Sequence, residues 1–168
     1  MAILDELRRR FGDAIVETDD HRGDLTAVIA RAALLSVLAH CRDEAALAFD
    51  VLMDLTAVDY SKFPGREDGP RFEVVYHLYS IARNHRLRLK VRVDQDDARV
   101  PTAVGLWPIA NWLEREAFDL LGIDFTDHPD LRRLLMPEDW VGHPLRKDFV
   151  EPDEYHGIST RRESLLKL

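Results

Sequence analysis

Three carboxylates in a short stretch, Glu114, Glu116 and Asp119, are the residues whose types and spacing come nearest to an acid–base site. On a helix, Glu116 and Asp119 lie three positions apart and share a face, whereas Glu114 and Glu116 do not. One interpretation is a proton-relay carboxylate, and the other is structural pairing with arginines nearby. We favour structural pairing, because no nucleophile and no metal-ligand spacing accompanies the three acids. For Asp54 and Asp59, in a mostly apolar stretch, a buried ion pair with an arginine is likewise favoured over a functional role.

Two histidines, His128 and His143, each precede a proline and are candidate metal ligands. Two isolated histidines without a close third ligand make a weak metal site, so hydrogen bonding to the backbone is the favoured role. Cys41 is the only cysteine, and one thiol forms neither an internal disulfide nor the several thiolate bonds of an iron–sulfur cluster. With no glycine-rich phosphate loop either, the sequence predicts no catalytic residue, metal or cofactor in this chain.

The charge balance limits the functions open to the chain. Its 168 residues carry a formal net charge of −8, which argues against general nucleic-acid binding, since that relies on a basic surface. A basic series, Arg86, Arg88, Lys90 and Arg92, has no aromatic residues interleaved for base stacking, so a solvated or partner-facing sheet surface is favoured over RNA binding. No run approaches the ~20 apolar residues that cross a bilayer, and the N-terminal residues do not resemble a signal peptide. We therefore expect membrane association only through a partner.

The elements that would position these residues include three predicted helices. Apolar residues at helical spacing indicate a helix over residues 3–11 and a second over residues 24–42, where an aspartate or threonine can cap the start. The third helix is predicted from about Pro108, which suits a first turn, to Gly122, which suits a C-terminal cap. Trp107 and Trp112 flank the start of this third helix, and we expect both to pack in the core.

Period-two alternation over residues 71–78 and 86–93 predicts two strands, and residues 14–17 are compatible with a short one. A further strand begins near residue 49, and its apolar set is expected to face a core: Phe49, Val51, Met53, Leu55 and Ala57. Residues 63–70 are rich in turn formers and predict a loop. The runs together predict an α+β domain over residues 1–122, with a small, mostly antiparallel sheet and helices packed on one face.

Residues 123–168 are predicted to form an extended C-terminal segment. Three prolines and Gly142 oppose a long helix over residues 123–150, yet large apolar residues make this stretch too apolar for a solvated linker. Either the segment wraps back over its own domain or it binds a second protein, with Trp140 and the arginines as binding hot spots. Basic residues woven between the apolar ones favour docking on a partner: Arg132, Arg133, Arg146 and Lys147.

Several motifs in one order make the sequence specific enough to compare with a family. Residues 111–125 (NWLEREAFDLLGIDF), 128–136 (HPDLRRLLM) and 142–149 (GHPLRKDF) resemble the signature of the C subunit of respiratory complex I, the 30 kDa subunit family. Residues 54–60 (DLTAVDY) and 71–78 (RFEVVYHL) are similar to the same family. The departures are small: the family usually has an aromatic residue at the position of Leu121 and often tyrosine at that of Phe118.

The resemblance implies a non-catalytic connecting subunit in the hydrophilic arm of a proton-translocating NADH:quinone oxidoreductase. Residues 123–168 would clasp the large, hydrogenase-like quinone-site subunit, and flavin and iron–sulfur clusters would reside in partner subunits. The complex would hold this chain, peripherally, on the cytoplasmic side of the cell inner membrane. The expected subunit-interface residues are Glu114, Arg115, Glu116, Asp119, His128, Arg132, Arg133, Trp140, Arg146, Lys147 and Asp148.

Two other functions stay open at this point. The same module resembles subunits of membrane-bound energy-converting hydrogenases and of dehydrogenases that use a deazaflavin donor, and one chain does not discriminate these machines. A free-standing binding module or small enzyme is the third possibility, and it predicts a monomer whose C-terminal segment folds back on its own domain. The dispersed apolar residues of that segment make this third possibility the weakest.

Overall fold

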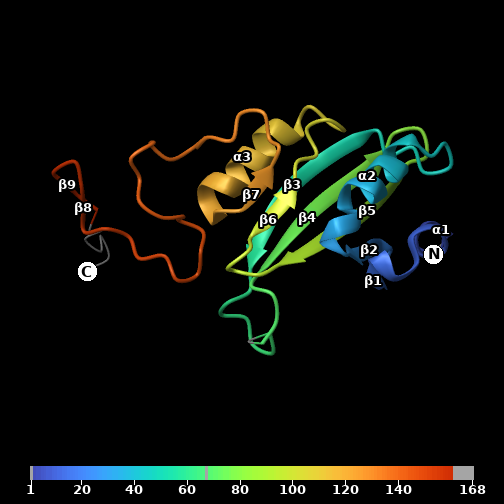
Figure 1. Cartoon of the computed structure of the whole chain (residues 1–168), viewed down its shortest axis with the longest axis horizontal. Helices are drawn as coiled ribbons and strands as arrows, with labels where there is room; N and C mark the ends of the chain where they lie inside the picture. The colour runs from blue at the N-terminus through green and yellow to red at the C-terminus, as the bar shows by residue number, and fades with distance from the viewer. Residues whose placement is uncertain (1, 67, 161–168) are drawn as a thin grey trace, which may run out of the picture.

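The computed structural model describes residues 2–66 and 68–160, and within them it confirms the α+β prediction (Figure 1). The three α-helices are α1 (Ala2–Phe11), α2 (Leu34–Asp43) and α3 (Ala110–Leu121). The main sheet contains β1 (Ile15–His21), β2 (Asp24–Ile29), β3 (Val51–Asp59), β4 (Phe72–Ser80) and β5 (His85–Val93). Two small sheets pair β6 (Arg99–Pro101) with β7 (Asp124–Thr126), and β8 (Glu154–Tyr155) with β9 (Ile158–Ser159).

The main sheet has the strand order β1-β2-β5-β4-β3, and all of its neighbouring strands are antiparallel except β2 and β5. Strands β3, β4 and β5 form the predicted antiparallel meander. The β4–β5 pairing runs from Phe72↔Val93 to Ser80↔His85 without a shift, and Asn84 closes the turn with a positive φ of 50°. Asparagine tolerates this left-handed conformation better than most residues do.

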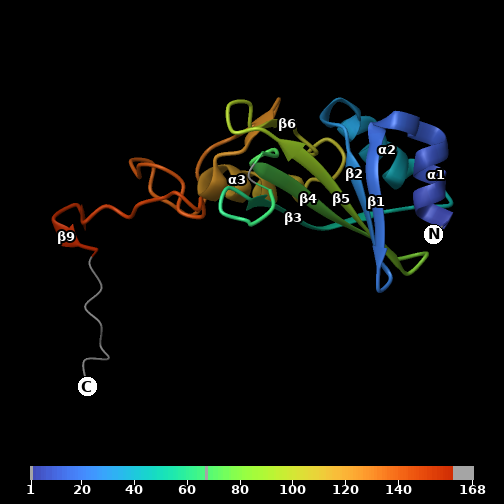
Figure 2. The ribbon, with the colours of Figure 1, turned by 90° about the horizontal axis from the view of Figure 1, so that it is seen from below.

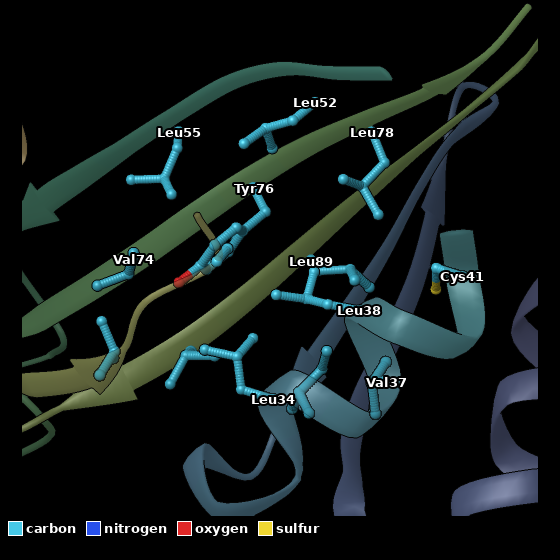
Figure 3. Packing of buried hydrophobic residues seen from close by; sticks show 14 of the residues in the cluster. Leu34, Val37, Leu38, Cys41, Leu52, Leu55, Val74, Tyr76, Leu78 and Leu89 are labelled. Atoms are coloured by element: carbon cyan, nitrogen blue, oxygen red, sulfur yellow. The ribbon is translucent and has the colours of Figure 1, made fainter. Parts of the chain in front are cut away.

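One face of the sheet forms the core with the helices. In β5, Leu87, Leu89 and Val91 are buried, while the basic residues between them point to the other face. Figure 3 shows side chains of α2, such as Leu34 and Leu38, directed at the sheet residues. Residues i and i+2 of a strand share one face, and the burial along β5 follows this alternation, which confirms the prediction.

The predicted phase of β3 is wrong over its first residues. The register shifts between Leu52 and Asp54, so a β-bulge adds one residue to β3 opposite β4. Leu52 is therefore buried, and Met53, expected in the core, is 51% exposed. Leu55 and Ala57 face the core as predicted.

The predicted helix over residues 24–42 is also wrong over its first half. Residues 24–29 form β2, which pairs antiparallel with β1 and parallel with β5, and α2 begins only at Leu34. Arg22 and Gly23 both have positive φ, 56° and 86°, which is the geometry of the tight turn that joins two twisted strands. Pairing with β5, distant in sequence, thus overrides the local helical pattern.

From residue 122 to residue 160 the chain is irregular except for short strands, in agreement with the prediction of an extended segment. The sequence does not predict β7, which runs parallel to β6 with Val100 opposite Phe125. Figures 1 and 2 show residues 123–160 passing around α3 and then leading away from the domain. Within the described ranges, no helix has the length and apolar character to span a membrane.

Candidate functional site at the junction of α3 and the C-terminal segment

Helix α3 carries the predicted acidic cluster, and its packing separates the three acids. Glu114 and Asp119 are fully buried, whereas Glu116 is exposed. Trp107 lies in the core as expected, but the expectation for Trp112 is wrong, since this side chain is 52% exposed. One side of α3 therefore packs on the domain, and another presents an aromatic residue and an acid to the outside.

Asp119 is the point at which α3 holds the C-terminal segment. Its Oδ2 accepts hydrogen bonds from the backbone N–H groups of Leu134, Leu135 and Met136 at 3.0, 2.7 and 2.8 Å. Its Oδ1 accepts one from Arg133 Nη1 at 2.7 Å. Burial by itself raises the pKa of the Asp119 carboxyl, but these four donors outweigh burial and hold that pKa below its usual range.

The last carbonyl groups of α3 are capped by the same segment. Leu145 N–H donates to Leu120 O at 3.0 Å, and Arg146 Nε donates to Leu121 O at 2.7 Å. His143 Nδ1 donates to Asp119 O at 2.9 Å, which requires the proton on Nδ1. The carbonyls at a helix C-terminus lack partners in the helix and carry partial negative charge, so the arginine satisfies both needs.

Gly122 makes this close approach possible. It ends α3 in the left-handed conformation, with φ 73°, as the sequence predicts. A Cβ atom at this position would collide with Arg146 Nη2 and would lie 2.6 Å from His143 Nε2. Only glycine combines this backbone conformation with the space for both side chains.

Two arginines join the turns of the segment to each other and to α3. Arg133 Nη2 donates to Trp140 O at 2.9 Å and Gly142 O at 3.1 Å. Arg115 Nε donates to Arg132 O at 3.1 Å, and its guanidinium lies 5.0 Å from the ring centroid of Trp112. Arg115 and Arg133, both expected at the subunit interface, therefore make contacts inside this chain.

Glu114 faces the loop before α3. Its Oε1 accepts from Ala103 N–H at 2.6 Å and its Oε2 from Thr102 Oγ1 at 2.5 Å. Burial raises the pKa of the Glu114 carboxyl to about 7, because two hydrogen bonds only partly replace the lost hydration. Burial, together with the nearby Glu114 carboxylate, raises the pKa of the Tyr76 hydroxyl on β4.

His128 lies beside this buried carboxyl, with Nε2 3.9 Å from Glu114 Oε2. Its Nδ1 accepts from Asp130 N–H at 3.0 Å, and its Nε2 donates to Asn111 O at 3.3 Å, so the ring is neutral. Burial lowers the pKa of His128 and maintains that neutral state. In the described part of the chain, no group of three or more His, Cys, Asp or Glu side chains is placed to hold a metal ion.

A second attachment involves Arg71, which the sequence does not single out. Asp59 Oδ2 accepts from Arg71 Nη2 at 2.7 Å, which confirms the expected buried ion pair for Asp59. Arg71 also donates from Nη2 to Asp148 Oδ1 at 2.6 Å, while Lys147 N–H donates to Asp59 Oδ2 at 2.9 Å. Asp54 is exposed, and the same expectation is wrong for it. The only sequence signal that could have indicated the role of Arg71 is its position directly before β4.

Of the remaining predicted residues, Arg132 and Lys147 are exposed and Trp140 is half-buried. Arg132 donates to Asp130 Oδ2 at 3.0 Å. The Trp140 ring packs against Tyr155, with 5.0 Å between centroids, and its Nε1 is buried without a hydrogen-bond partner among the described residues. Large apolar side chains remain exposed along the segment: Leu135, Val141, Leu145, Val150 and Ile158.

Comparison with known proteins gives this geometry a context. Residues 27–155 match the family described as respiratory-chain NADH dehydrogenase, 30 Kd subunit. The C subunit of the NADH-quinone oxidoreductase of Roseiflexus sp. (strain RS-1) is 50% identical over 146 residues, which cover 87% of this chain and 81% of that protein. The corresponding protein of Geotalea uraniireducens (strain Rf4) is 45% identical over 144 residues, covering 86% and 84%.

Two solved structures share the fold. A trypsin-resistant fragment (1–134) of Nqo5 has a TM-score of 0.68 and 34% identity, and the match covers 78% of this chain and 100% of the fragment. A chain of the membrane-bound sulfane sulfur reductase, an archaeal respiratory membrane complex, has a TM-score of 0.66 and covers 89% of this chain and 84% of that one. Its 24% identity shows the fold alone.

Proposed function

The chain belongs to the family of the 30 kDa subunit of respiratory-chain NADH dehydrogenase, and we propose from this membership that it works as the C subunit of complex I. The observation that carries the proposal is identity of 45–50% to named C subunits, over more than four fifths of both chains. The reaction of the whole complex is electron transfer from NADH to quinone. This chain contributes to it by connecting other subunits and holding them in place, and it carries no catalytic residue, flavin or iron–sulfur cluster of its own.

The docking surface of this subunit combines the outer side of α3 with the C-terminal segment. Trp112 and Glu116 project from α3, and Leu135, Val141 and Val150 are exposed along the segment. Large apolar side chains that recur in exposed positions along one segment favour burial against a partner. The Trp140 indole N–H, buried without an acceptor among the described residues, would gain one from that partner.

The partner that fits is the large, hydrogenase-like quinone-site subunit, with other subunits of the hydrophilic arm around it. The interface residues expected from the sequence divide into two roles within this proposal. The buried Asp119 and the half-buried Arg133 and Arg146 shape the segment, and exposed residues such as Glu116 and Arg132 face the partner. Contact with the cytoplasmic side of the inner membrane comes through the complex.

The test is to tag this chain in its own host, extract membranes with mild detergent and identify the proteins that co-purify. Recovery of the large subunit together with an NADH-oxidising flavoprotein is the expected result. Recovery of hydrogenase or deazaflavin-dependent components instead would show that the chain is a subunit of one of those related complexes. Recovery of the chain by itself from the soluble fraction would overturn the connecting role.

A further inference from the structure

We infer that Arg71, directly before β4, is the positioning residue that sets where residues 150–160 leave the domain toward the partner. The inference rests on the proposed function, because it assigns Arg71 a role in presenting the docking segment. Arg71 belongs to the domain and its side chain is only 9% exposed, so it is a fixed point rather than part of the segment.

Arg71 grips one carboxylate of the domain and one of the segment at the same time. Its Nε and Nη2 donate to Asp59 at 3.1 and 2.7 Å. Its Nη2 and Nη1 donate to the two carboxylate oxygens of Asp148 at 2.6 and 2.9 Å. Nη1 also donates to Gln95 Oε1 at 2.6 Å. The planar guanidinium is suited to such two-sided bidentate binding, and a lysine ammonium is not.

The backbone of the segment is held at the same place. Lys147 N–H donates to Asp59 Oδ2 at 2.9 Å, and Phe149 N–H donates to Arg146 O at 3.1 Å, which closes a tight turn. The guanidinium groups of Arg71 and Arg146 both lie near the Phe72 ring, with their Cζ atoms 4.9 and 5.2 Å from its centroid. Residues 146–149 are thereby fixed on the start of β4.

After residue 149, the side-chain contacts described here lie within the C-terminal segment itself. Val150 is 84% exposed, and the side chains of Tyr155 and His156 bind Asp139, a residue of the C-terminal segment itself. The Asp59–Arg71–Asp148 group therefore attaches the segment to the domain directly before this stretch. A fixed exit point lowers the conformational entropy that is lost when the segment docks.

The variant Asp148→Asn tests the inference without disturbing the core, because Asp148 is exposed and the buried Arg71–Asp59 pair stays intact. Hydrogen exchange of the full chain is measured over residues 143–150, which include the Lys147 N–H. Loss of a charge-assisted pair should accelerate exchange there roughly tenfold and leave β4 and β5 unchanged. Asp127→Asn, an exposed change in the same segment, is the matched control and should leave exchange unaltered.

Co-purification from the host supplies the second readout. Asp148→Asn should recover less of the large subunit than wild type at an unchanged melting temperature, and Asp148→Glu should restore part of it. Unchanged exchange in Asp148→Asn would overturn the inference, and so would faster exchange with undiminished recovery of the partner. Failure of the wild-type chain to recover any partner would instead refute the proposed function, which distinguishes the two failures.

Discussion

Asp119 and Arg133 lie fourteen residues apart and join α3 to the C-terminal segment through a 2.7 Å hydrogen bond between Oδ1 and Nη1. Arg133 also donates from Nη1 to the Asp119 carbonyl oxygen at 3.2 Å, so one guanidinium binds both the side chain and the backbone of the same residue. The other oxygen of the carboxylate, Oδ2, binds three successive backbone N–H groups. This pair fixes residues 133–136 of the segment on the helix.

Asp119→Ala should lower the free energy of unfolding of the isolated chain by about 3–5 kcal/mol, because it leaves the Arg133 charge and three N–H groups without their acceptor. Urea denaturation measures the loss. Glu116→Gln, an exposed change on the same helix, is the control and should stay within about 0.5 kcal/mol of wild type. Equal stability of the two variants would contradict the structural role of Asp119.

Gly122→Ala should destabilise the chain beyond the usual penalty for a left-handed alanine. The methyl group meets His143 Nε2 at 2.6 Å and also collides with Arg146, so the segment must move off the end of α3. Gly23→Ala is the matched control, since Gly23 has φ 86° and open space around it, and it should cost only about 1 kcal/mol. Thermal unfolding of both variants gives the comparison, and equal losses would exclude the collision.

Glu114 should make the chain less stable as the pH rises. Its folded-state pKa of about 7 lies above the ordinary value of 4.5, so the folded state binds the proton more tightly. The associated stabilisation, about 3 kcal/mol, is complete below pH 4.5 and is lost as the pH rises to 7. Burial lowers the pKa values of His128 and His143, so these two residues oppose this slope. Their contribution to the stability of the chain is lost as the pH falls below 6.5.

The Glu114→Gln variant isolates that contribution. Its amide preserves an acceptor for Ala103 N–H and a donor for Thr102 Oγ1, but it does not titrate. The difference in unfolding free energy between wild type and Glu114→Gln should therefore change between pH 4.5 and 7 and be flat above that range. A difference that is independent of pH would show that the Glu114 pKa is not raised.

Trp112→Ala and Glu116→Gln should weaken assembly while leaving the isolated chain folded. Both side chains are exposed on α3, so their replacement removes little from the core. A tryptophan that becomes buried at an interface contributes about 2 kcal/mol or more, so Trp112→Ala should reduce recovery of the large subunit most. Co-purification and melting temperature are measured together. Undiminished recovery in Trp112→Ala would remove this side of α3 from the docking surface.

Local patterns in the sequence are sufficient to predict several elements. The alternation from Leu87 to Val93 defines the two faces of β5, because side chains alternate strictly along a strand. Gly122 ends α3 because it adopts the left-handed conformation at low cost. The motifs over residues 111–149, interpreted as a family signature, agree with the family that matches residues 27–155.

Features that depend on distant pairing are beyond local patterns. Residues 24–29 have the apolar spacing of a helix start, but they form a strand because they pair with β5, which lies more than 50 residues away in the sequence. The bulge that exposes Met53 depends in the same way on how β3 meets β4. Such pairings are decided by burial and by hydrogen bonds between strands, which a local window does not contain.

By itself, the sequence determined the kind of domain, the limits of α3 and the family, since these follow from periodicity, capping residues and ordered motifs. Tertiary structure decided which charged side chains are paired inside the chain and which are available to bind a partner. Arg133 and Arg146 have the sequence context of docking residues, yet they bind Asp119 and the carbonyl of Leu121. Arg71 does not stand out in the sequence, and it joins Asp59 to Asp148. The partner of a long charged side chain is set by whichever groups the fold brings within reach, and this information appears only when the chain is folded.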